Sequence, residues 1–141
     1  MPDLPLDLLE RLVVGAVAVT ERAIAAAGAD LTFVQWRVLL IVGEQPGGAT
    51  VGEIASRIGA NESPASRLVS RLKRRGVVWT ARDATDGRVT RVHLTEAGQA
   101  MRTHVLDHRR HDLAAVIEAV PMTPAEVGAI ARLGRSFEPF R

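Results

Sequence analysis

The 141-residue sequence contains no cysteine. It therefore has no disulfide framework, no thiolate metal site and no cysteine redox switch. It also lacks an apolar run near the roughly 18 residues of a membrane-spanning helix, since Glu21 and Arg22 follow the apolar stretch at residues 12–19. The first ten residues, MPDLPLDLLE, lack the basic start of a signal peptide. These absences predict a cytoplasmic protein with no membrane partner.

The composition is that of one globular domain, with 47% hydrophobic and 24% charged residues. Its charge is unevenly distributed. Residues 57–91 hold nine basic residues against three acids, a net charge of +6, whereas the rest of the chain has a net charge of −4. A basic middle between acidic ends is typical of a chain in which one patch meets a polyanion. The alternative is a solvated arginine-rich helix face.

Two helices are predicted before the basic region. Asp3 and Pro5 indicate the start of the first, whose apolar residues recur at helical spacing as far as Gly28. This helix has more apolar surface than packing against a single neighbour would bury, so we expect it to pack against two neighbours. A capping box, Thr32-x-x-Gln35, begins the second helix.

The basic region begins with a predicted helix-turn-helix. Thr50-x-x-Glu53 is a second capping box, and Gly59 ends its helix. The next helix follows at once, with Asn61 as the expected N-cap and Gly76 as its end. Two short helices joined by such a tight turn are typical of a helix-turn-helix. The predicted exposed face of the second one carries Glu62, Ser63, Ser66, Arg67, Ser70, Arg71, Arg74 and Arg75.

A β-hairpin is predicted next, because Asp86-Gly87 separates strand-like residues 77–79 from residues 89–94. Two further helices then follow, the first from Thr95 to a stop at Pro121 and the last from a capping box, Thr123-x-x-Glu126. The predicted fold is mainly α with a small β-hairpin wing, a winged helix-turn-helix. Its recognition helix fits the major groove of DNA, and a basic hairpin suits the adjacent minor groove. The hairpin presents Arg82, Arg88, Thr90 and Arg91.

In its motifs and their order the sequence resembles the MarR (multiple-antibiotic-resistance regulator) family of bacterial transcription factors. The resemblance covers nearly the whole chain. The motifs that carry it are Leu31-Thr32-x-x-Gln35, Ile54-Ala55, residues 66–72 (SRLVSRL) running into Arg75-Gly76-Val77-Val78, the wing Asp83-x-x-Asp86-x-Arg88, and Val92-x-Leu94-Thr95-x-x-Gly98.

The resemblance implies a single domain, residues 1–141. Residues 3–30 and 96–141 would form dimerisation helices, and residues 31–95 a DNA-binding lobe. It implies a homodimeric repressor on an inverted-repeat operator, released by a small aromatic or phenolic effector that binds between the dimer helices and the lobe. Arg88 corresponds to the family's minor-groove arginine, and Asp86 to the acid that orients it. The complete set of expected DNA-binding residues is Ser63, Ser66, Arg67, Ser70, Arg71, Lys73, Arg74, Arg88, Thr90 and Arg91.

Three alternatives accompany this prediction. Trp36 either contacts the effector or belongs to the core. His104, His108 and His111 share one stripe of a predicted helix, so they either bind a metal ion, giving a metal-responsive regulator, or form a polar face. The basic surface either binds DNA or docks an acidic protein partner. No nucleophile motif or phosphate-binding glycine loop is present, so we expect neither an enzyme nor a cofactor.

Overall fold

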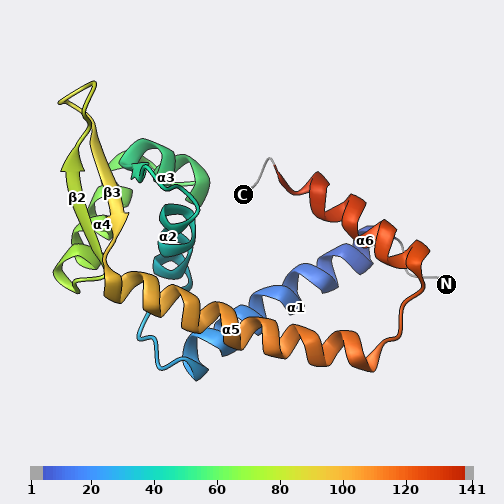
Figure 1. Cartoon of the computed structure of the whole chain (residues 1–141). Coiled ribbons are helices and arrows are strands. Elements are labelled where there is room, and N and C mark those ends of the chain that lie inside the picture. The colour runs from blue at the N-terminus through green and yellow to red at the C-terminus, as the bar shows by residue number, and fades with distance from the viewer. Residues whose placement is uncertain (1–4, 139–141) are drawn as a thin grey trace.

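The structure is a computed structural model that describes residues 5–138 (Figure 1). The predicted mainly α fold with a small β-hairpin is confirmed. The expected helix start at Asp3 lies outside the described residues. In chain order, the described elements are α1 (Pro5–Ala26), α2 (Phe33–Gly43), β1 (Ala49–Thr50), α3 (Val51–Ile58), α4 (Glu62–Arg74), β2 (Val78–Arg82), β3 (Thr90–Leu94), α5 (Glu96–Ala119) and α6 (Pro124–Ser136).

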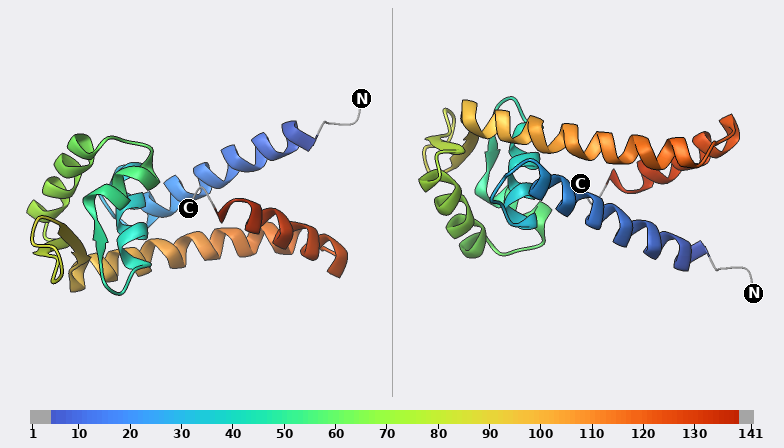
Figure 2. Two further views of the ribbon diagram at one scale, coloured as in Figure 1. Left: turned by 90° about the horizontal axis from the view of Figure 1, so that it is seen from above. Right: turned by 90° about the horizontal axis from the view of Figure 1, so that it is seen from below.

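The elements form two regions. α2, α3, α4 and the sheet make up a lobe at one end, while α1 and α5 extend away from it and α6 folds back from the far end of α5 (Figure 1). Seen from above and below, α1 and α5 diverge as they leave the lobe (Figure 2). Both regions therefore share α5, which begins against the lobe and ends far from it.

Local sequence signals explain where the helices begin. The three predicted capping boxes are all present, with the hydroxyls of Thr32, Thr50 and Thr123 accepting from the backbone N–H three residues later. Gly59 ends α3 in the left-handed conformation, with φ of 68°. The predicted N-cap position of Asn61 in α4 is confirmed, although its side chain makes no capping hydrogen bond.

The sheet is antiparallel, with strand order β1-β3-β2. The predicted hairpin is confirmed as β2 and β3, in which Trp79 pairs with His93 and Ala81 with Arg91. Strand β1, whose two residues pair with Val92 and Arg91, was not predicted. A two-residue strand has no alternation to detect, and its partner lies about forty residues further along the chain.

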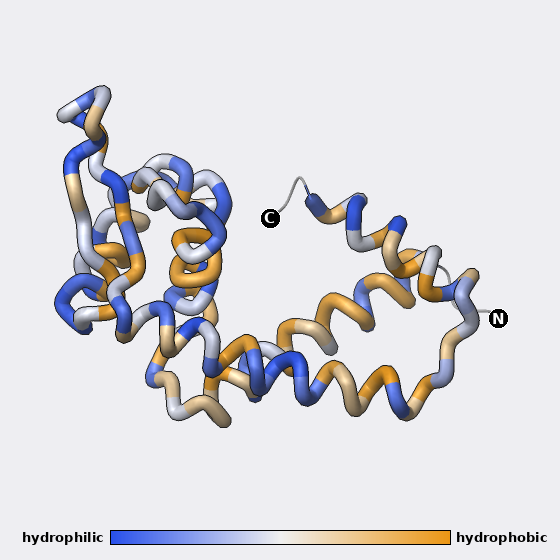
Figure 3. The backbone as a smooth tube through the Cα atoms, in the orientation of Figure 1, coloured by the Kyte–Doolittle hydropathy of each residue, from blue (hydrophilic) through white to orange (hydrophobic). Residues whose placement is uncertain are grey.

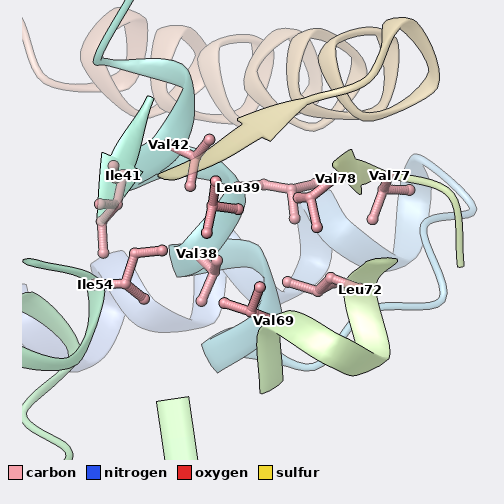
Figure 4. Close-up of a cluster of buried hydrophobic side chains, with 11 residues drawn as sticks. Val38, Leu39, Ile41, Val42, Ile54, Val69, Leu72, Val77 and Val78 are labelled. Carbon is pink, nitrogen blue, oxygen red and sulfur yellow. The ribbon is translucent and has the colours of Figure 1, made fainter. Parts of the chain in front are cut away.

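A hydrophobic core fills the lobe and includes the fully buried Val38, Leu39, Ile54 and Leu72 (Figure 4). Val92 of β3 belongs to the same cluster and is also fully buried. A second cluster joins the lobe to the long helices: Ala23 and Ile24 of α1 and Val105 of α5 pack around Trp36. At the start of α5, a Cβ on Gly98 would collide with the carbonyl oxygen of Val77. The inner ends of α1 and α5 are therefore packed firmly against the lobe.

The outer parts of the long helices are different, because their apolar side chains face outward. Figure 3 shows hydrophobic residues recurring along α1, along the distal half of α5 and along α6. None of the described helices is long and apolar enough to cross a membrane. The exposed large hydrophobic residues on these helices are Leu6, Leu8, Leu12, Val13, Val14, Val17, Leu113, Val116, Ile117, Val120, Val127, Ile130 and Leu133.

Candidate nucleic-acid interface

Helix α4 is strongly amphipathic. Ala65, Val69 and Leu72 are buried against the lobe, so the intervening residues point outward at helical spacing. Every residue predicted on its outer face is exposed, namely Glu62, Ser63, Ser66, Arg67, Ser70, Arg71, Arg74 and Arg75. The side of α4 proposed for DNA is therefore free in the structure.

The basic residues of α4 and of its C-cap, Arg75, fall into two groups. Lys73 Nζ donates a hydrogen bond of 2.9 Å to Thr80 Oγ1 on β2, and the Arg75 guanidinium donates to the carbonyl oxygen of Asp30. These two cations hold α4 in place. Within residues 5–138, no hydrogen bond or ion pair engages the guanidinium groups of Arg67, Arg71 and Arg74, so these remain available to a ligand.

The wing carries Arg88 at its tip, with 96% of the side chain exposed. Asp86 lies beside it: one carboxylate oxygen accepts from the Arg88 backbone N–H at 3.0 Å and lies 3.6 Å from Arg88 Nε. The structure thus brings together the two wing residues that the family resemblance pairs. An arginine projecting this far from a hairpin has the reach needed to enter a narrow, electronegative groove.

Arg91 has a different position from that of Arg88. Its guanidinium forms an ion pair with Asp83 and donates at 3.2 Å to the carbonyl oxygen of Gly48. The Thr85 hydroxyl, followed by Arg91 and the backbone N–H groups of Asp86 and Thr85, holds the pKa of Asp83 far below its usual value. In turn, Asp83 raises the pKa of Arg91. The structure therefore places Arg91 at the base of the wing as an anchor.

Between α4 and the wing lies a hollow of about 630 Å³. The start of α3 forms its floor, and the predicted residue Thr90 lies on its wing side. The exposed start of α4, the start of α3 and the wing with Arg88 thus frame one continuous hollow of mixed polar and apolar character. Its lining consists of Thr50, Val51, Gly52, Glu62, Ser63, Ser66, Arg88, Val89 and Thr90.

A second, apolar groove of about 450 Å³ lies between α1 and α6. It reaches the lobe at Phe33, and its walls are almost entirely hydrocarbon. Trp36 does not line it. The lining residues are Leu9, Leu12, Val13, Ala16, Val17, Thr20, Phe33, Ile130, Leu133, Gly134 and Phe137.

Trp36 belongs to the core, since only 1% of it is exposed. The Arg109 guanidinium lies over its ring, 5.9 Å from the centroid. Burial, followed by the charges of Arg110 and Arg102, lowers the pKa of Arg109. Of the two expectations for Trp36, the structure favours the core over direct contact with an effector.

The histidine stripe does not assemble a metal site. The rings of His104 and His108 meet edge-on with their centroids 5.0 Å apart. Among the residues that the structure describes, no group of three or more histidine, aspartate or glutamate side chains is arranged to hold a metal ion. The three-histidine site with His111 is therefore not formed in this structure.

Comparison with known proteins matches residues 29–89 to the MarR family model. IacR, an HTH-type transcriptional repressor of Pseudomonas putida, is 42% identical over 69 residues, 49% of this chain and 41% of that protein. The chain thus matches less than half the length of this relative. MosR of Mycobacterium tuberculosis, solved in complex with DNA, is 27% identical with a TM-score of 0.61 and 99% of both chains covered. BpsR of Bordetella bronchiseptica, whose DNA binding is regulated by 6-hydroxynicotinic acid, shares the fold: 23% identity, TM-score 0.71, 96% of this chain and 93% of that one.

Proposed function

Because this chain belongs to the MarR family of transcriptional regulators through its winged-helix region, residues 29–89, we propose that it is a sequence-specific DNA-binding repressor. It acts as a homodimer on an inverted-repeat operator. The observation that carries the proposal is the pairing of two unobstructed cationic elements: the exposed face of α4 and the projecting Arg88, on either side of one hollow. A lobe of this shape matches a major groove and the minor groove next to it.

In this proposal α4 lies in the major groove. Arg67 and Arg71 reach base edges or clamp phosphates with their unpaired guanidinium groups. Ser63, Ser66 and Ser70 supply short hydroxyl contacts, and Arg74 and Lys73 contact the backbone. Lys73 keeps donors for a phosphate while it holds Thr80, since an ammonium group has three. Arg88 enters the minor groove, Thr90 faces the backbone that crosses the hollow, and Arg91 supports the wing from its base.

Dimerisation explains the outward-facing apolar residues of α1, α5 and α6. A monomer would leave these residues, together with the α1–α6 groove, in water, which soluble monomers rarely do over such an area. A second copy with two-fold symmetry covers the same surface on both chains. It also presents two α4 helices to successive major grooves, which is why the operator is an inverted repeat.

The proposed repressor is released by a small aromatic or phenolic effector. BpsR, which has the same fold, is regulated by 6-hydroxynicotinic acid. In this chain we assign the outer part of the α1–α6 groove to the second copy, and the end of the groove at Phe33 offers the effector an apolar wall between α1 and the lobe. A ligand bound there contacts both regions at once and so has the means to change their relative position.

The first experiment is fluorescence anisotropy on the full chain, with the DNA directly upstream of its gene and a scrambled duplex of equal length, at 50 and 200 mM salt. We expect tight binding to the upstream DNA only, weakening steeply with salt as phosphate contacts are screened. Equal weak binding to both duplexes, or no binding at low salt, contradicts the proposal for this DNA. Absence of any binding favours the alternative, an acidic protein partner for the basic surface.

A further inference from the structure

Glu62 stands out on the proposed DNA-facing surface. It is the first residue of α4, it is exposed, and it is the one acid lining the hollow between α4 and the wing. Its side chain reaches toward α3, where its Oε1 atom lies 3.1 Å from the position that a Cβ on Gly52 would occupy. A carboxylate here faces incoming phosphates and so works against general affinity for DNA.

Local helix capping does not explain Glu62. In α3 and α6, the glutamates of the capping boxes, Glu53 and Glu126, accept hydrogen bonds of 2.7 Å from the backbone N–H of the N-cap threonine. Glu62 stands at the first helical position instead of the third, and its N-cap, Asn61, has no side-chain capping bond. Within residues 5–138, no hydrogen bond or ion pair engages its carboxylate. Both oxygens are therefore free to accept hydrogen bonds.

We propose that Glu62 is a specificity-determining residue that accepts a hydrogen bond from the exocyclic amino group of a cytosine in the major groove; the inference rests on the proposed function. Residues at the N-terminal end of a recognition helix are those that meet base edges. An ionised carboxylate only accepts, so it pairs with cytosine N4 and is repelled by the acceptor edges of guanine and thymine. Glu62 thereby lowers the affinity for DNA of any sequence and raises the discrimination between bases.

The test is selection of operator variants from a library randomised around the bound site, using wild type, Glu62→Gln and Glu62→Ala. For wild type we expect cytosine at two symmetry-related positions. In Glu62→Ala, the preference for cytosine over the other bases falls by about tenfold. In Glu62→Gln, whose side chain donates as well as accepts hydrogen bonds, the preferred base shifts toward adenine. Preferences elsewhere in the site stay unchanged. Glu118→Gln, which removes one exposed acid from the far part of α5, is the matched control and keeps the wild-type ranking.

The outcomes separate the inference from the proposed function. If wild type selects no sequence at all, the proposed function fails. If wild type selects an operator and both Glu62 variants keep the same base ranking while binding every duplex more tightly, Glu62 acts only by repelling phosphates and the inference is overturned. Thermal unfolding of each variant confirms that the exposed substitutions leave the fold intact.

Discussion

The lobe and the outer helices differ in how they place their large apolar side chains. In the lobe, short capped helices enclose a core whose largest side chains are fully buried, such as Leu72. In the outer helices, which are α6 and the parts of α1 and α5 away from the lobe, large apolar residues are exposed: Leu12 of α1 is 65% exposed and Val116 of α5 is 53% exposed. The lobe completes its own hydrophobic core, whereas the outer helices leave theirs open.

The two regions therefore derive their stability from different sources. Core burial within one chain is independent of protein concentration. Burial between two chains depends on concentration, because association stabilises only the fraction that is bound. Substitutions in the two regions should therefore have effects that differ in kind as well as in size.

The largest effect is expected for Val116→Asp, which places a carboxylate on the exposed apolar face of α5. Two symmetry-related carboxylates lose water in the dimer, so we expect association to weaken by at least about 4 kcal/mol and DNA binding to fall with it. Light scattering measures the molar mass of the purified variant. Val116→Thr, which nearly preserves side-chain shape, serves as the control and remains dimeric. An intact Val116→Asp dimer would show that α5 lies outside the interface.

A pair of leucine truncations separates burial within one chain from burial between two chains. Leu72→Ala leaves a cavity in the lobe and should cost about 2–5 kcal/mol of unfolding free energy at any protein concentration. Leu12→Ala, on the exposed face of α1, should lower the unfolding temperature by an amount that depends on concentration. Urea and thermal unfolding at two concentrations tenfold or more apart measure both. A concentration-independent loss for Leu12→Ala contradicts its place in the interface.

A smaller effect is confined to the lobe's outer surface. Arg88→Ala should weaken binding to the operator by about 1–3 kcal/mol, the range for a good groove contact. It should not change molar mass or unfolding temperature. Anisotropy titrations on the operator measure the loss, with Arg110→Ala, an exposed arginine of α5, as the control. Unchanged affinity for Arg88→Ala would show that the wing does not reach DNA.

The smallest expected effect concerns the base of the wing. Because Asp83 has a pKa below its usual value in the folded chain, its stabilising effect is complete above the unfolded-state pKa of about 3.9. It is lost only as pH falls toward the lower folded pKa. The stability gap between wild type and Asp83→Asn should therefore be constant from about pH 7 to pH 5 and narrow below pH 4. Urea unfolding midpoints at several pH values test this, and a gap that changes between pH 7 and pH 5 excludes Asp83 as the cause.

Much of this organisation could be predicted from local sequence signals. The three threonine capping boxes, the left-handed Gly59 and the burial of one face of α4 each depend on residues within a few positions of one another. Periodicity and turn chemistry report such short-range features directly. The same signals located the wing, because its turn separates two neighbouring strands.

What the sequence did not show depends on contacts between distant residues. Arg91 is a basic residue in the predicted wing and was therefore expected to bind DNA. Its guanidinium instead donates a hydrogen bond to the carbonyl oxygen of Gly48, 43 positions away. Strand β1 exists only because β3 pairs with it, and Trp36 is buried because α1 and α5 pack around it. Neither residue type nor spacing encodes which side chains the fold brings together. For Glu62, the sequence signal that could have drawn attention to it is its place at the first position of α4, where a glutamate does not form a capping box.

The continuity of α5 has a mechanical consequence. This 24-residue helix is a lever about 36 Å long, with one end packed against the lobe through Gly98 and the other carrying Val116. A tilt of only about 5° at the far end moves the lobe by about 3 Å, roughly the rise of one base pair. In the proposed dimer, opposite tilts of the two α5 helices would double the change in spacing between the two α4 helices. In the proposed regulator, contacts made by the distal part of α5 would in this way alter a spacing that must match the helical repeat of DNA.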